Sequence, residues 1–249
     1  MDVENLNFSY SNGFYIEDLS FKIGEDSIYA LTGNNGSGKT TLLKLIVGLL
    51  KPKSGTIKLF GETLTRNKHQ LWKIRQKIGF LFQNPDDQLF APSIEEDVAF
   101  GARNLKLKEE EIKFRVEWAL EAVDLIDYKR YSPFNLSWGQ KKRAALAGLL
   151  AMKPKLLILD EPFANLDFKS IYNHLKILDT LRVEEEMTIL FTTHNSFFVE
   201  NWADNMLVLN GGNKLFEGDP KEGLKKPKVK KIMGSYEDIH KLIQNNREG

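Results

Sequence analysis

The stretch GNNGSGKTT, which spans residues 33–41, restricts the fold of this chain more than any other feature. It matches the pattern G-x-x-x-x-G-K-[ST] and lies between the apolar runs SIYAL and LLKLIVGLL. Its glycines let the backbone approach a polyanion closely, and a helix that follows presents free N–H groups and the positive end of its dipole to phosphates. The sequence therefore predicts a phosphate-binding loop between a buried strand and a helix.

The side chains of this loop indicate a nucleotide with a metal ion. Lys39 is expected to reach the β- and γ-phosphates, and the Thr40 hydroxyl to ligate Mg²⁺. A chance match in a glycine-rich turn is the alternative, but the strand before the loop and the helix after it argue against it. The residues of the loop that we expect to bind are Gly33, Asn34, Asn35, Gly36, Ser37, Gly38, Lys39, Thr40 and Thr41.

Short apolar runs elsewhere predict buried strands of a parallel sheet covered by helices, which is an α/β fold. The predicted strands are residues 27–32, 77–83, 156–160 and 188–194. The predicted helices are residues 39–50, 109–126 and 139–152.

Two regions depart from this rhythm and favour antiparallel strands. The first residues alternate apolar and polar side chains around Asn12-Gly13, and the segment 51–62 carries turn glycines, so both are expected in a small flanking sheet. A further hairpin is expected around Gly211-Gly212. The basic run KKPKVKK at 225–231 is interpreted as a solvated linker, followed by a polar tail.

Acidic residues follow one predicted strand, and a histidine follows another. LLILDEP places Asp160 at a strand end, where it can hold Mg²⁺, with Glu161 beside it to polarise an attacking water. The strand 188–194 ends in His194. Taken singly, Glu161 has the alternative of a surface carboxylate and His194 that of a core histidine. We expect these strand ends to converge with the phosphate loop at the carboxyl edge of the sheet.

The residues LSWGQ at 136–140 predict a second anion-binding helix start. Ser137 and Gly139 precede a helix that begins near Gln140, and the basic run 141–143 is expected to reinforce its positive end. One chain would then carry two phosphate-facing surfaces. A head-to-tail dimer explains both, because the loop of one subunit and the LSWGQ of the other would enclose each nucleotide. A small-molecule kinase with the same loop leaves LSWGQ unexplained.

Composition excludes some classes of protein. Lys and Arg number 35 against 34 Asp and Glu, so bulk charge gives no reason to expect nucleic acid. Cysteine is absent, which excludes disulfides and thiolate metal sites. The N-terminus has no pattern of an export signal. The run LLKLIVGLL is interrupted by Lys44 and is shorter than the ~20 residues of a membrane span. We expect contact with a membrane only through another protein.

In this order of motifs, residues 1–220 resemble the ATP-binding-cassette (ABC) ATPases. The resemblance implies a P-loop core, an antiparallel β subdomain, and a helical subdomain at about 84–152 that carries the signature LSWGQ, with 221–249 as a short charged tail. It also implies ATP and Mg²⁺ as cofactors. Tyr10 would stack on adenine, with Phe8 and Tyr15 as competitors. The remaining implied site residues are Gln83 as sensor of Mg²⁺ and γ-phosphate, Asp160 as Mg²⁺ ligand, Glu161 as general base, His194 as γ-phosphate contact, Ser137, Gly139 and Gln140 as signature contacts, and Asp167 as a dimer contact.

The segment QNPDDQLFAPSIEEDVAFG, residues 83–101, looks like the energy-coupling-factor and cobalt/nickel importer type. That resemblance implies a second ATPase subunit, identical or different, a transmembrane coupling protein that contacts about 84–101, and a substrate-binding membrane subunit reached indirectly. The chain would lie at the cytoplasmic side of the membrane. Negative charge for the contact with the coupling protein would come from Asp86, Asp87, Glu95, Glu96 and Asp97; the alternative is that these carboxylates are simply solvated. Trp138 departs from the usual LSGGQ, although a bulky side chain there can point away while Ser137 and Gly139 keep their phosphate contacts. Another ABC transporter type or a soluble ABC ATPase are the alternatives.

Overall fold

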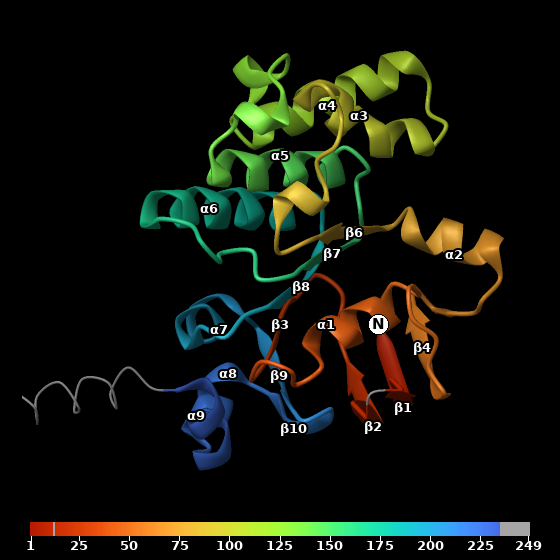
Figure 1. The fold of residues 1–249 in the computed structure, drawn as a ribbon, viewed down its shortest axis with the longest axis vertical. Helices are drawn as coiled ribbons and strands as arrows, with labels where there is room; N and C mark the ends of the chain where they lie inside the picture. Colours follow the sequence, from red (N-terminus) through yellow and green to blue (C-terminus); the bar gives the residue numbers. More distant parts are fainter. Residues whose placement is uncertain (12, 235–249) are drawn as a thin grey trace, which may run out of the picture. The chain divides into compact units, whose positions relative to one another are not determined.

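The computed structural model describes residues 1–11 and 13–234, which fall into two compact units. The first unit consists of Met1–Leu64 and the chain from Thr192 onward, and the second unit consists of Thr65–Phe191. Figure 1 shows their helices and strands.

An antiparallel sheet in the first unit confirms the predicted flanking strands. Its order is β2-β1-β4-β5. Register shifts along β1 accompany Asn5, which adopts a positive φ of 50°. Because of this irregularity, Val3 and Leu6 both face the core although an unbroken strand would place them on opposite faces. Asn12 of the predicted hairpin turn lies outside the described residues. The strands are β1 (Asp2–Ser9), β2 (Tyr15–Lys22), β4 (Ser54–Leu59) and β5 (Glu62–Thr63).

Other strands of the first unit position the phosphate loop. Strand β3 (Ile28–Gly33) is buried along its whole length and pairs in parallel with β9 (Asn205–Asn210). The predicted hairpin at Gly211-Gly212 joins β9 to β10 (Asn213–Gly218). Helix α1 (Lys39–Ile46) follows the loop after β3 and ends earlier than predicted, since Gly48 takes a positive φ of 69° that stops the helix.

The C-terminal part of the first unit is more ordered than the sequence suggested. After α7 (Ser196–Trp202) and the hairpin, the chain forms α8 (Pro220–Lys225) and α9 (Pro227–Met233). The interpretation of residues 225–231 as a solvated linker is therefore wrong, because α9 buries Val229 while its lysines stay largely in solvent. The rest of the predicted tail, from 235 on, lies outside the described residues.

The second unit contains a run of parallel strands with helices. Strand β7 (Leu156–Leu159) pairs with β6 (Ile78–Leu81) on one side and β8 (Thr188–Thr192) on the other, which confirms the predicted strands. Helices α3, α4 and α5 pack on one another (Figure 1). The unit's helices are α2 (Lys68–Arg75), η1 (Pro85–Asp87), α3 (Ile94–Asn104), α4 (Glu109–Ala122), η2 (Ile126–Tyr128), η3 (Pro133–Asn135), α5 (Trp138–Leu150) and α6 (Phe168–Glu184).

Helix α4 is shorter than predicted for a local reason. The pattern predicted a helix to residue 126, but Asp124 adopts a positive φ of 56° and the helix ends at Ala122. Across residues 1–11 and 13–234, no helix combines the length and the apolar character that crossing a bilayer requires.

Two glycines of the first unit provide a test of the antiparallel sheet. Gly55 and Gly61 both have positive φ, but a Cβ on Gly55 would lie 2.3 Å from the Asn5 carbonyl oxygen, whereas a Cβ on Gly61 would meet nothing within 4 Å. Both alanine variants suffer backbone strain, and only Gly55→Ala adds a clash. We expect Gly55→Ala to lower the free energy of unfolding by about 2 kcal/mol more than Gly61→Ala, measured by urea unfolding. Equal losses would contradict the contact.

Candidate functional site

The phosphate loop follows β3 directly, and close packing holds its backbone. Gly33 has φ 143°, and a Cβ there would lie 2.2 Å from the Leu209 carbonyl oxygen and 2.7 Å from Ser37 Oγ. The Ser37 carbonyl oxygen accepts a bond from the Gly212 N–H at 3.0 Å. The hairpin between β9 and β10 therefore contacts the phosphate loop at Gly33 and Ser37, while residues 34–36 face solvent.

The start of α1 has the features of an anion site. Gly38, with φ 105°, is its N-cap, and no side chain caps the helix. The first N–H groups of a helix need a partner, and a phosphate can supply it. The Ser37 hydroxyl is buried with no hydrogen-bond partner among the described residues. Lys39 Nζ donates to the carbonyl oxygens of Gly33 at 2.8 Å and Asn34 at 3.3 Å, so its ammonium lies over the loop.

Aromatic residues of the first hairpin lie near this loop. Phe8 is buried, which removes it as a competitor for adenine, and Tyr10 packs edge-on against it with ring centroids 4.8 Å apart. Phe14 was not anticipated from the sequence. Its ring would be 2.7 Å from a Cβ on Gly38, so it lies directly against the start of α1. Tyr10 is 36% exposed and 6.3 Å from the Phe14 ring, and Tyr15 is 48% exposed.

His194 lies in the first unit, just beyond the end of β8. Thr193 N donates to the Leu31 carbonyl oxygen at 3.3 Å, which fixes this segment beside β3. Partial burial and the nearby charge of Lys39 both lower the pKa of His194 from its ordinary value. The structure therefore brings His194 into the electrostatic neighbourhood of the phosphate-loop lysine, and its imidazole is neutral at pH 7.

In the second unit, the neighbouring strands β6 and β7 end at the same edge. Leu81 pairs with Leu159, and Asp160 N donates to the Leu81 carbonyl oxygen at 2.9 Å. Gln83 therefore follows one strand and Asp160 the next at this edge. Asp160 is 8% exposed and Glu161 is 7% exposed, so Glu161 is not the surface carboxylate of the alternative interpretation. Glu161 has a positive φ of 48°, which is unusual for a residue with a side chain.

The signature segment LSWGQ forms the start of α5. Ser137 is its N-cap: Ser137 Oγ accepts from Gln140 N at 3.3 Å, and Gln140 Oε1 accepts from Ser137 N at 2.9 Å. Gly139 lies against α6, since a Cβ there would be 3.0 Å from Ser170 Oγ. Trp138 is half-buried, and its Nε1 is buried with no partner among the described residues.

Asp167 caps the neighbouring helix α6. Its carboxylate accepts from Ser170 N at 2.8 Å and Ser170 Oγ at 3.1 Å, and these bonds lower the pKa of Asp167. Ser170 is the residue that Gly139 approaches, so the structure brings the signature and Asp167 together within the second unit.

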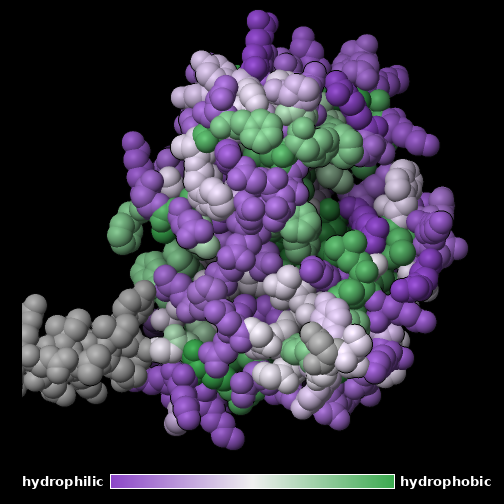
Figure 2. Space-filling model, in the orientation of Figure 1, coloured by the Kyte–Doolittle hydropathy of each residue, from purple (hydrophilic) through white to green (hydrophobic). Residues whose placement is uncertain are grey.

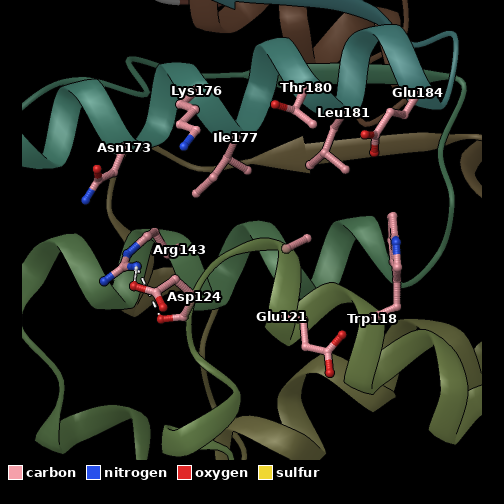
Figure 3. A pocket seen from close by; sticks show the side chains of 11 residues that line it. Trp118, Glu121, Asp124, Arg143, Asn173, Lys176, Ile177, Thr180, Leu181 and Glu184 are labelled. Atoms are coloured by element: carbon pink, nitrogen blue, oxygen red, sulfur yellow. Dashed lines mark hydrogen bonds and ion pairs between the residues drawn. The ribbon is translucent and has the colours of Figure 1, made fainter.

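The expectation that the basic run 141–143 reinforces the positive end of α5 is wrong, because each side chain has another partner. Lys141 pairs with Asp86 at 2.7 Å. Lys142 is fully buried and donates to backbone carbonyls that follow β7. Arg143 donates to the Val123 carbonyl oxygen at 2.8 Å, beyond the end of α4. Figure 3 shows Arg143 directed at Asp124, in a pocket of about 460 Å³ between α6 and the α4–α5 pair.

Helical spacing could have identified Lys142 as a buried residue. Lys142, Ala145 and Leu146 are three and four residues apart and lie on the buried face of α5. A lysine on an apolar stripe must find partners for its ammonium in the interior. Phe14 carried no comparable signal, since only its position in the folded hairpin places it against Gly38.

The acidic segment 84–101 borders an apolar groove. The groove measures about 280 Å³, and its walls include Phe82, Phe90, Phe100 and Ala145. Hydrophobic side chains gather in the region of α3–α5 on the face shown in Figure 2. Phe90 is 62% exposed and packs edge-on against Phe100 with centroids 4.9 Å apart.

Asp97 is not available as a surface charge. It is buried, and its carboxylate accepts from Phe90 N at 3.2 Å and Ala91 N at 3.0 Å. Burial raises its pKa, although these two bonds act in the opposite direction. The expectation that Asp97 supplies charge to a partner is therefore wrong; it holds the loop that carries Phe90. Asp86, Asp87 and Glu96 remain exposed.

Comparison with known proteins places these features in a family. The ABC transporter family matches residues 16–164. The energy-coupling factor transporter ATP-binding protein EcfA of Carboxydothermus hydrogenoformans is 42% identical over 259 aligned residues, which cover 100% of this chain and 95% of the relative. EcfA of Methanosphaera stadtmanae is 43% identical over 223 residues, which cover 89% of this chain and 80% of the relative.

Solved structures give the same result. The structure of cbiO1 from Clostridium perfringens, part of the ABC transporter complex cbiONQ, has a TM-score of 0.84 at 38% identity and covers 98% of each chain. A dimeric ATP-binding cassette in a post-hydrolysis state with ADP and Pi has a TM-score of 0.78 at 27% identity, covering 88% of this chain and 98% of that one.

The effect of Lys39 on His194 can be tested by titration. Lys39→Met removes the smaller of the two causes, so the pKa of His194 should rise toward 6.5 but stay below it, because burial remains. NMR of the imidazole resonances measures this shift. Lys44→Met, a charge change in the last turn of α1, is the matched control and should leave the pKa unchanged. Identical titrations for wild type and Lys39→Met would contradict the proximity.

The same pKa has a consequence for stability. Because the folded-state pKa of His194 lies below its ordinary value of 6.5, protonation favours the unfolded chain. The contribution of His194 to the free energy of unfolding is therefore at its maximum above pH 6.5, and it declines as the pH falls below 6.5.

Proposed function

The chain belongs to the ABC transporter family, and from that premise we propose that it is the ATP-hydrolysing subunit of an energy-coupling-factor importer for a vitamin or metal-ion micronutrient. The observation that carries the nucleotide site is the start of α1, where a glycine loop, an uncapped helix and the Lys39 ammonium meet. The relatives named EcfA and cbiO1 support the transporter type.

The residues of this chain suit ATP with Mg²⁺. The buried Ser37 hydroxyl without a partner among the described residues and the start of α1, which no side chain caps, suit phosphate oxygens. Mg²⁺ prefers oxygen ligands and keeps several waters, which fits the few oxygen donors proposed here, the Thr40 hydroxyl, the Asp160 carboxylate and the Gln83 amide. When bound, the ion would neutralise phosphate charge. Tyr10 would stack on adenine, and Phe14 supports the loop beside it.

We assign the water-activating role to Glu161 and the γ-phosphate contact to His194. A carboxylate that is 7% exposed at a strand end is held in place and partly dehydrated, as a general base requires. A neutral imidazole can donate one hydrogen bond to the γ-phosphate without an acidic pH.

A second cassette would complete each nucleotide site. Ser137, Gly139 and Gln140 at the start of α5 would face the nucleotide of the partner, and Asp167 at the start of α6 would contact that partner. A related cassette is dimeric in its solved structure. The capping box of α5 leaves other first-turn N–H groups for a phosphate, so the start of this helix suits the role.

The groove beside 84–101 is the proposed contact for a transmembrane coupling protein. Apolar walls with Phe90 at the rim, and exposed carboxylates of Asp87 and Glu96 nearby, suit an amphipathic helix with basic residues. The chain would then lie at the cytoplasmic face of the membrane through this partner, and substrate choice would lie in another membrane subunit.

Replacing the proposed general base tests the activity. Glu161→Gln keeps the size and removes the basic carboxylate, so phosphate release should fall about 10²-fold or more while ATP binding persists. The variant should also accumulate as a dimer in Mg-ATP, measured by size-exclusion chromatography. Glu121→Gln, at an exposed position of α4, is the matched control. A Glu161→Gln protein that stays monomeric and still hydrolyses would count against the proposal.

The groove can be tested by co-purification from native membranes in mild detergent. Phe90 is 62% exposed and Phe114 is 60% exposed, and only Phe90 lines the groove. Phe90→Ala should reduce the recovered membrane partner about tenfold, as expected for an exposed aromatic residue that becomes buried on binding. Phe114→Ala should recover it normally. Recovery of soluble partners alone with wild type would refute the transport assignment but leave the ATPase chemistry standing.

A further inference from the structure

Lys142 makes a set of contacts that no role assigned so far requires. Its side chain is 0% exposed. Its Nζ donates to the carbonyl oxygens of Glu161 at 2.9 Å, Pro162 at 3.0 Å and Ala164 at 3.0 Å. A lysine ammonium has three donors, so these bonds use all of them. A buried charge is normally costly, and here backbone dipoles compensate it.

The loop that Lys142 holds has an unfavourable backbone. Glu161 has φ 48° and Asn165 has φ 61°, both in the left-handed region that residues with a Cβ rarely adopt. Such conformations persist only where surrounding contacts fix them. Within the loop, a backbone bond joins Ala164 N to the Glu161 carbonyl oxygen at 3.2 Å. The Lys142 ammonium binds the carbonyl oxygens of Glu161, Pro162 and Ala164, so it holds this turn through a side chain from another element.

The charged surroundings keep Lys142 protonated at neutral pH. Burial lowers its pKa to about 8, while the charges of Glu161 and Asp160 act in the opposite direction. His174, from α6, also faces it, but burial lowers the pKa of His174 to about 4. His174 is therefore neutral and does not repel the ammonium. The positive charge of Arg143, the next residue, is directed to the end of α4.

Lys142 also connects the Glu161 loop to the start of α5. It lies two residues after Gln140, in the first turns of the helix that the Ser137 cap begins. On the same helix, Gly139 contacts Ser170, whose N–H and hydroxyl bind Asp167. The start of α5 thus holds the segment after β7 at two places, near Glu161 and near Asp167.

We propose that Lys142 is a positioning residue for ATP hydrolysis: its ammonium holds the backbone turn that aims the Glu161 carboxylate. This rests on the proposed role of Glu161. Loss of the ammonium should move the carboxylate and slow the chemical step. It should leave ATP binding unaffected, because the phosphate loop does not include this residue.

The first test compares Lys142→Met with Lys141→Met in the full chain. Methionine keeps the length of the side chain and removes the donors. We expect the kcat of Lys142→Met to fall about tenfold or more with the KM for ATP within about twofold of wild type, because misplacing a catalytic group by about 1 Å costs that much or more. Lys141→Met removes a neighbouring lysine that pairs with Asp86, and its kcat should be unchanged.

A chemical rescue separates positioning from folding. The sequence contains no cysteine, so Lys142→Cys can be alkylated selectively with 2-bromoethylamine in the unfolded state and then refolded. This restores an ammonium at almost the length of lysine, and kcat should recover. Alkylation with 3-bromopropylamine keeps the charge but adds one methylene, and kcat should stay low. This pair of adducts decides the matter even if Lys142→Met does not fold.

The outcomes distinguish this inference from the proposed function. A folded Lys142→Met protein with wild-type kcat would overturn the inference, even if its melting temperature fell, and so would equal kcat values for the two adducts. If Glu161→Gln hydrolyses ATP like wild type, the role of Glu161 fails first. If Glu161→Gln is inactive and Lys142→Met is not impaired, only the positioning role of Lys142 fails.

Discussion

Sharp turns at the carboxyl ends of buried parallel strands set where the proposed site residues lie. Gly33 ends β3 with φ 143°, and Glu161 follows β7 with φ 48°. A strand that must turn at once into a loop or helix presents its next residues at the sheet edge, where ligands of α/β proteins bind. At the first turn glycine avoids any side-chain strain. At the second turn the residue is Glu161, whose side chain makes the positive φ unfavourable, and contacts from neighbouring elements hold the backbone there.

The second unit also contains buried charged side chains whose hydrogen bonds are made by backbone groups. The Lys142 ammonium meets three carbonyl oxygens, and the Asp97 carboxylate meets two N–H groups. Each lies against a loop that carries a residue with a proposed role, Glu161 in one case and Phe90 in the other. A charge can remain in the interior only when its hydrogen bonds are made, so each of these side chains depends on the geometry of the loop that it contacts.

Much of the fold followed from local patterns. The buried strands, the antiparallel strands and the hairpin at Gly211-Gly212 were predicted, because apolar runs and turn glycines act within a few residues. Helix ends were less accurate: α1 stops before Gly48 and α4 before Asp124, since a single residue with positive φ ends a helix whatever the apolar pattern beyond it. The basic run at α9 was misread, because Val229 is the one apolar residue within it and is buried in the folded chain.

The sequence by itself determined the chemistry that neighbouring residues build: a glycine loop before a helix, a second helix start at LSWGQ, and carboxylates after a buried strand. Their partners lie within a few residues, so spacing was sufficient. Only the tertiary structure decided where the other charges go. Asp97 looks like a solvated side chain in sequence, and helical spacing indicates at most that Lys142 is buried. The backbone groups that compensate both charges come from other segments, which only the folded chain brings to them.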